Sequence, residues 1–204
     1  MKRALTLLSF GIALAFASAP LFASGDADNG KTKSATCVAC HGADGNAVDP
    51  QYPRLAGQYN EYIQQALHEY KDGRRGNAVM KTQVANLSDQ DIEDIAAYLQ
   101  GSAPAKAASA APPPKAPKQV APCIACHGEN GLGVDGMNPS PPTLAGQHVD
   151  YLEQALTSYR NGRRKNVVMD SMAALLTSDE DVKVAAAYFA GQPSSLATAT
   201  TESK

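Results

Sequence analysis

The sequence predicts an all-α fold built from two similar domains in tandem. Long segments of the first half return in the second half: residues 53–58 (Pro-Arg-Leu-Ala-Gly-Gln) match 142–147, and 73–80 match 162–169. Apolar and aromatic residues recur at helical spacing in both halves, and no stretch of useful length alternates as a strand would. Duplication of one domain is the simplest explanation.

Each half shows the same helix signals in the same order. One apolar face is formed by Tyr59, Tyr62, Ile63, Ala66, Leu67 and Tyr70, and it returns as Tyr151, Leu152, Ala155, Leu156 and Tyr159. Gly73 and Gly162 are expected to end these helices. Ser88 and Ser178, each followed three residues later by Asp, predict capped last helices that run through positions 99 and 190. The tyrosine stripes are interpreted as buried packing faces.

The beginning of the chain is typical of an export signal. A basic start, Met1-Lys2-Arg3, precedes the apolar stretch 4–17, and small residues follow. We expect residues 1–23 to be a signal peptide cleaved after Ala23, with cleavage after Ala19 as the alternative. An uncleaved anchor is disfavoured because the apolar run is short for a bilayer and is interrupted by polar and small residues. The chain is therefore expected in the periplasm.

The remaining chain divides by composition into a first domain (24–100), an Ala/Pro-rich linker (101–118), a second domain (119–193) and a Ser/Thr/Ala-rich tail (194–204) expected to be disordered. Residues 25–100 hold seven basic and eleven acidic side chains, a net charge of −4, while 101–204 hold nine of each. Neither half has the excess of basic residues that would suggest a nucleic-acid partner.

The pentapeptide Cys-x-x-Cys-His occurs twice and uses all four cysteines. It comprises Cys37, Cys40 and His41 in the first half and Cys123, Cys126 and His127 in the second. This spacing is the attachment signature of c-type haem. The two thiols can each bond to one vinyl group of the porphyrin, and the adjacent His is the proximal iron ligand. The sequence therefore predicts two covalently bound haem c groups and no disulfide.

Two other uses of Cys-x-x-Cys are less consistent with the pattern. A shared zinc site would need the pairs closer in sequence, and each pair here has its own adjacent His. A thioredoxin-like redox site belongs near a βαβ pattern, and none surrounds either pair.

The internal repeat selects the sixth iron ligands. The candidates are Met80, Met137, Met169, Met172, His68 and His148. Only Met80 and Met169 occupy equivalent positions, so the pairs His41/Met80 and His127/Met169 are predicted. A thioether favours ferrous iron and so raises the potential. It also fills the coordination sphere and leaves no site for a substrate.

The repeated loop between His and Met is expected to support each haem. A ligating imidazole usually donates its other N–H to a carbonyl, and Pro53 and Pro142 are candidate acceptors. Leu55 and Leu144 would then pack on the haem; the alternative is that both prolines only shape the loop. The arginine pairs 74–75 and 163–164 either neutralise propionates or lie solvated at helix ends.

These motifs together resemble the dihaem cytochrome c4 family over essentially the whole mature chain. The resemblance rests on two Cys-x-x-Cys-His-Gly modules, paired Leu-Ala-Gly-Gln loops, the downstream methionines and a final helix with Ser-Asp-x-Asp and Ala-Ala-Tyr. It implies two class I cytochrome c domains related by a pseudo-twofold axis, with haems close enough to exchange electrons. It also implies that Gly30 in a first helix packs on Tyr98 in the last.

The second domain departs from this pattern at its start. Pro114, Pro117 and Pro122 disfavour a full first helix before Cys123. Tyr188 and Phe189 are then expected to pack against the linker or the other domain.

These observations allow three candidate functions to be ranked. The leading one is a periplasmic, non-enzymatic electron carrier between respiratory donors and an acceptor such as a terminal oxidase. Its expected partners are an oxidase, a cytochrome or copper protein, or a membrane dehydrogenase complex, with peripheral membrane association only through partners. The alternative is the cytochrome subunit of a flavocytochrome c sulfide dehydrogenase. A dihaem peroxidase is disfavoured, because it needs an open iron and the paired methionines predict two closed ones.

Overall fold

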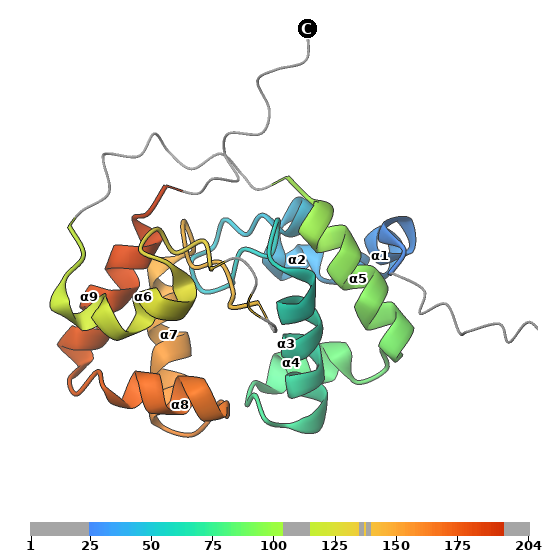
Figure 1. Ribbon diagram of the computed structural model, residues 1–204. Coiled ribbons are helices and arrows are strands. Elements are labelled where there is room, and N and C mark those ends of the chain that lie inside the picture. Colours follow the sequence, from blue (N-terminus) through green and yellow to red (C-terminus); the bar gives the residue numbers. More distant parts are fainter. Residues whose placement is uncertain (1–24, 104–114, 135–136, 138–139, 194–204) are drawn as a thin grey trace, which may run out of the picture.

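The computed structural model describes residues 25–103, 115–134, 137 and 140–193, and within them the fold is helical, with one isolated backbone bridge and no strand. The predicted signal peptide and tail lie outside these residues, as does most of the linker. No helix of the described part is long and apolar enough to cross a membrane. Figure 1 shows the two domains side by side, the first in blue and green and the second in yellow to red.

The first domain contains five α-helices. They are α1 (Ala27–Lys33), α2 (Val38–His41), α3 (Asn60–Asp72), α4 (Ala78–Val84) and α5 (Asp89–Gly101), with the short 3-10 turns η1 (Ser34–Thr36) and η2 (Ala43–Gly45). Helix α1 lies directly on α5. A Cβ at Gly30 would come within 1.9 Å of the Asp94 carbonyl oxygen and 2.9 Å of the Tyr98 Cβ. The expected contact of Gly30 with Tyr98 is therefore present, and only glycine allows it.

The second domain repeats this arrangement, and its described residues, from 115 on, include no counterpart of α1. Its elements are η3 (Lys118–Val120), α6 (Ala121–His127), α7 (Val149–Arg160), α8 (Val167–Ala174) and α9 (Asp179–Ala190). Val120 of η3 is fully buried in the core cluster that includes α9, and Ala116 is partly buried against the same cluster. Tyr188 and Phe189 thus pack against the end of the linker and their own domain, and Tyr188 donates to the Glu129 carbonyl at 2.8 Å.

The helix ends follow the signals in the sequence. Ser88 and Ser178 each accept from the backbone of the residue three positions on, and Asp91 and Asp181 return the bond, so both capping boxes are formed. Gly73 ends α3 in the left-handed conformation.

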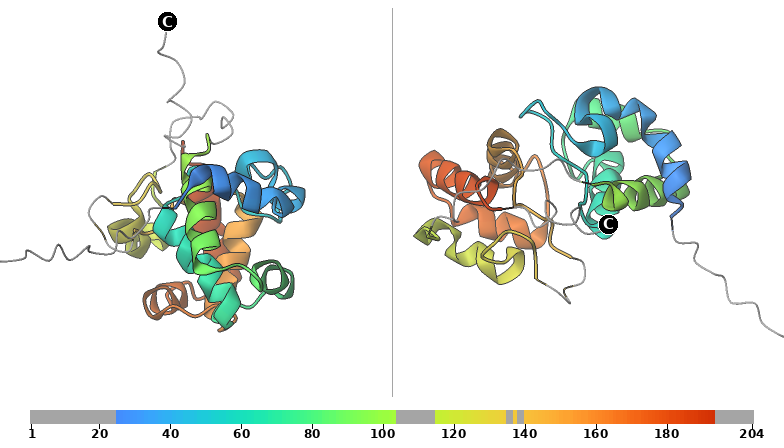
Figure 2. Two further views of the ribbon diagram at one scale, coloured as in Figure 1. Left: turned by 90° about the vertical axis from the view of Figure 1, so that its right-hand side faces the viewer. Right: turned by 90° about the horizontal axis from the view of Figure 1, so that it is seen from above.

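Equivalent residues of the two domains meet across a pseudo-twofold axis. Arg75 and Arg164 form an antiparallel bridge, in which Gly76 N–H donates to the Arg163 carbonyl at 2.7 Å and Lys165 N–H to the Arg74 carbonyl at 2.8 Å. The first domain (blue and green) and the second (yellow to red) lie on opposite sides of the molecule in the right-hand view of Figure 2. Because the same surface of each repeat forms the contact, the interface is isologous in the sense used for dimers.

Candidate haem-binding sites

Each Cys-x-x-Cys-His motif lies on a short helix that ends in a glycine turn. His41 is the last residue of α2 and His127 the last of α6, and Gly42 and Gly128 follow with φ of 75° and 73°. A Cβ at Gly42 would come within 2.3 Å of the Asn46 carbonyl oxygen. The turn therefore requires glycine and brings the following loop back toward the histidine.

Both histidines are buried and held by the predicted prolines. His41 Nδ1 lies 3.1 Å from the Pro53 carbonyl oxygen, and His127 Nδ1 lies 3.2 Å from that of Pro142. Because a carbonyl can only accept, each Nδ1 is the donor, and the lone pair of the neutral ring is on Nε2. Burial lowers the pKa of both histidines. Each ring is thus a neutral imidazole with a free ligand atom, the form that binds a metal.

A cavity of about 350 Å³ adjoins the second motif. Cys123, Cys126, His127 and Met169 all line it, so the structure brings together the four residues predicted for the second haem. Much of its wall is apolar and is contributed by Leu144, Leu152, Ala155, Leu156, Ala185, Ala186 and Phe189. Met137 also lines the cavity and is a second thioether within this site.

Asparagine caps position the two predicted methionines alike. Asn77 precedes α4 and accepts from the Met80 N–H at 3.0 Å, while Asn166 precedes α8 and accepts from the Met169 N–H at 3.1 Å. Leu55 packs against the core cluster of the first domain, as Leu144 does against that of the second. The rejected candidate His148 instead lies at the domain interface, 2.9 Å from the Ala47 carbonyl oxygen.

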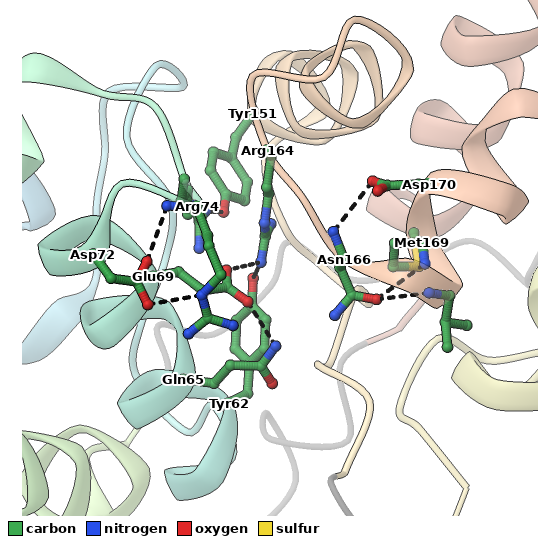
Figure 3. A network of polar contacts seen from close by, with 12 residues as sticks. Tyr62, Gln65, Glu69, Asp72, Arg74, Tyr151, Arg164, Asn166, Met169 and Asp170 are labelled. Carbon is green, nitrogen blue, oxygen red and sulfur yellow. Dashed lines mark hydrogen bonds and ion pairs between the residues drawn. The ribbon is translucent and has the colours of Figure 1, made fainter.

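A cluster of buried charges lies between the domains (Figure 3). The side chains of Arg164 and Glu69 are 5% and 0% exposed, and their nearest N and O atoms are 3.5 Å apart. Arg75 donates to the Tyr151 hydroxyl and Arg164, symmetrically, to that of Tyr62. The tyrosines of both stripes are buried or half-buried, and Tyr62 and Tyr151 contact the opposite domain. Arg75 and Arg164, the second residue of each arginine pair, are buried and are therefore not solvated at helix ends.

The charge of this cluster fits an anionic group such as a haem propionate. The cluster holds two buried guanidinium groups, of Arg75 and Arg164, and one buried carboxylate, of Glu69, which leaves an excess of positive charge. Burial raises the pKa of Tyr62, but Arg164 and Arg75 outweigh it and lower the pKa to about 7. The Nε of Arg164, a residue that lines the cavity, is buried without a hydrogen-bond partner. The residues present therefore fit a haem, whose propionates Arg164 would help to neutralise.

Sequence reasoning did not identify Gln58, Gln147 or Glu69 as functional residues. The two glutamines lie within the repeated loop, and that repetition was the available signal. Glu69 had no such signal, because the equivalent position in the second half is Ser158.

Comparison with known proteins shows the same double domain. The cytochrome c family model matches residues 27–103 and 115–190. Cytochrome c4 of Pseudomonas aeruginosa is 37% identical over 189 residues, which cover 83% of this chain and 90% of that protein. The chain belongs to the dihaem cytochrome c4 family.

A solved member of the cytochrome c4 family has the same fold. Reduced recombinant cytochrome c4 from Pseudomonas stutzeri matches with a TM-score of 0.71 at 35% identity, covering 82% of this chain and 99% of that one. The thiosulfate dehydrogenase electron acceptor of Stutzerimonas stutzeri is also 35% identical, over 76% of this chain and 77% of that protein. As a cytochrome c4, the chain carries two covalent haem c groups and acts in electron transfer.

Proposed function

We propose that this protein is a periplasmic carrier that passes electrons from respiratory donors to an acceptor such as a terminal oxidase. Cys37 and Cys40 hold the first haem, and Cys123 and Cys126 the second. The axial pairs are His41 with Met80 and His127 with Met169. The observation that carries this proposal is the single cavity in which the cysteines, histidine and methionine of the second repeat meet.

The residues around each site favour outer-sphere electron transfer. When bound, each haem supplies one ferric/ferrous couple. The Pro53 and Pro142 carbonyls fix the orientation of the two histidines. Apolar side chains such as Leu144 and Leu152 exclude water from the second site, and a low dielectric favours the less charged, ferrous state. With a histidine and a methionine each holding one haem iron, no position would remain for a substrate, and this would separate the carrier from a dihaem peroxidase.

The proposed axial ligands are tested by replacing each methionine with alanine in the full haem-loaded protein. Met80→Ala and Met169→Ala should each remove half of the weak long-wavelength absorption band of methionine-bound ferric haem, lower one potential and leave haem content unchanged. Met137→Ala is the matched control, because Met137 lines the same cavity as Met169. If Met137→Ala removes the band and Met169→Ala does not, the assignment for the second haem is wrong.

The enzyme alternative is tested by ligand binding. Two closed irons should bind neither cyanide nor carbon monoxide in native protein at concentrations that saturate an open haem. Binding at one haem would support a peroxidase-like site.

The identity of the donor is a separate proposal. The likeness to a thiosulfate dehydrogenase electron acceptor favours a sulfur-compound dehydrogenase among the donors. Stopped-flow reduction by a purified thiosulfate dehydrogenase with thiosulfate tests it directly. A rate no faster than that of a single-domain cytochrome c would remove this donor class.

A further inference from the structure

The peptide group that holds the first proximal histidine is also bound by the second domain. The Pro53–Arg54 peptide accepts from His41 Nδ1 through its carbonyl at 3.1 Å. Its N–H donates to Oε1 of Gln147 at 2.9 Å. The Gln147 side chain forms a second hydrogen bond with the Arg54 backbone, from Nε2 to the Arg54 carbonyl at 2.9 Å.

The second proximal histidine is held in the same way by the first domain. The Pro142–Thr143 peptide accepts from His127 Nδ1 at 3.2 Å, and its N–H donates to Oε1 of Gln58 at 2.9 Å. Gln58 Nε2 donates to the Thr143 carbonyl at 3.0 Å. Each glutamine therefore reaches across the interface to the peptide behind the other domain's histidine.

Both glutamines are fixed in place. Gln58 and Gln147 are 6% and 8% exposed. Each Oε1 accepts a second bond from the N–H of the next residue, Tyr59 or His148, at 3.0 Å. A buried amide with all these bonds formed has one orientation, so its effect on the peptide is constant while the domains are docked.

We propose that Gln147 tunes the first haem and Gln58 tunes the second, each from the opposite domain and through the peptide behind the proximal histidine. This rests on the proposed function, in which His41 and His127 are the iron ligands. A bond accepted from a peptide N–H polarises the group and makes its carbonyl a stronger acceptor. The histidine then becomes a more basic ligand, which stabilises ferric iron. Both glutamines thus act as positioning residues that lower the potential of the haem across the interface.

The consequence is that docking of the domains and the two potentials depend on one another. A domain that separates from its partner loses the glutamine behind its own histidine. Its haem then loses the contribution by which that glutamine lowers the potential.

The test uses Gln147→Met and Gln58→Met in the full haem-loaded chain. Methionine is close to glutamine in size and cannot bind the peptide. The potential of each haem and its paramagnetically shifted NMR signals are measured, with haem signals assigned from Met80→Ala and Met169→Ala. Gln147→Met should raise the potential of the first haem and shift its histidine signals, and Gln58→Met should do the same to the second haem only.

Two further variants separate tuning from loosening of the interface. Gln147→Glu keeps an acceptor for the Arg54 N–H and should not raise the first potential. Tyr59→Phe removes another interdomain bond, from the Tyr59 hydroxyl to the Leu132 carbonyl at 2.8 Å, and should leave both potentials unchanged.

The decisive result is that each glutamine variant shifts the potential of the haem in the opposite domain. Equal shifts of both haems in either variant, a shift confined to the variant's own domain, or no shift would each overturn the proposal. Failure of the proposed function is seen separately, because Met80→Ala and Met169→Ala would then leave the haem signals unchanged.

Discussion

Replacing Glu69 by Gln should weaken the contact between the domains more than a substitution of an uncharged residue at the equivalent position does. The Glu69 side chain is fully buried, and its carboxylate lies 3.5 Å from the Arg164 guanidinium of the other domain. At an effective dielectric of about 20, this attraction is about 5 kcal/mol. Relief of carboxylate desolvation offsets part of it, while Arg164 stays buried without a counter-charge. Removing one partner of such a pair costs about 3 kcal/mol, and we expect that loss in domain docking.

The assay is thermal unfolding of the haem-loaded protein together with the potential of each haem. Glu69→Gln should lower the first unfolding midpoint. It should also raise the potential of the second haem, because Arg164 lines that cavity and becomes a less compensated positive charge. The matched control is Ser158→Ala, at the equivalent position of α7, where the hydroxyl donates to the Gln154 carbonyl of its own helix. If Glu69→Gln behaves like Ser158→Ala in both measurements, the buried pair contributes nothing.

Further predictions concern the first domain. Gly30→Ala should destabilise it by about 3 kcal/mol in urea unfolding, because the new Cβ meets the Asp94 carbonyl at 1.9 Å, whereas Gly101→Ala, with nothing within 4 Å, should not. Hydrogen bonds from Lys33 and the cap of α5 lower the pKa of Asp91 from 3.8 to about 2. Its contribution to stability is therefore present above the ordinary carboxyl range and is lost as the pH falls from about 4 to about 2. Circular dichroism of Asp91→Asn should show a smaller acid loss of stability over that interval, and an unchanged acid curve would contradict the assignment.

The local features of the fold could be predicted because they depend on residues close together in sequence. The capping boxes at Ser88 and Ser178 and the end of α3 at Gly73 are set by the next few residues. Pro117 and Pro122 disfavour a full helix before Cys123, and in the described residues 115–120 the structure has only the short turn η3. The Pro53 and Pro142 acceptors could be proposed because a metal-bound imidazole needs a partner and the repeat supplied the same residue twice.

The interface could not be predicted, because it depends on how two folded domains meet. Arg75 and Arg164 read equally well as solvated helix ends, and only their burial against the opposite tyrosines decides between the two. Gln58 and Gln147 are polar residues in loops, and their partners lie 85 to 93 positions away. Glu69 has no counterpart in the second half, so the repeat gave no indication of its role.

The pseudo-twofold contact also bears on how the protein behaves on dilution. An isologous surface is self-complementary, so two separate copies of such a domain would associate only at concentrations near their dissociation constant. In this chain a single connection joins the two copies, and association becomes intramolecular, at an effective concentration on the order of millimolar. The two haem-binding domains therefore stay together at any cellular abundance of the protein.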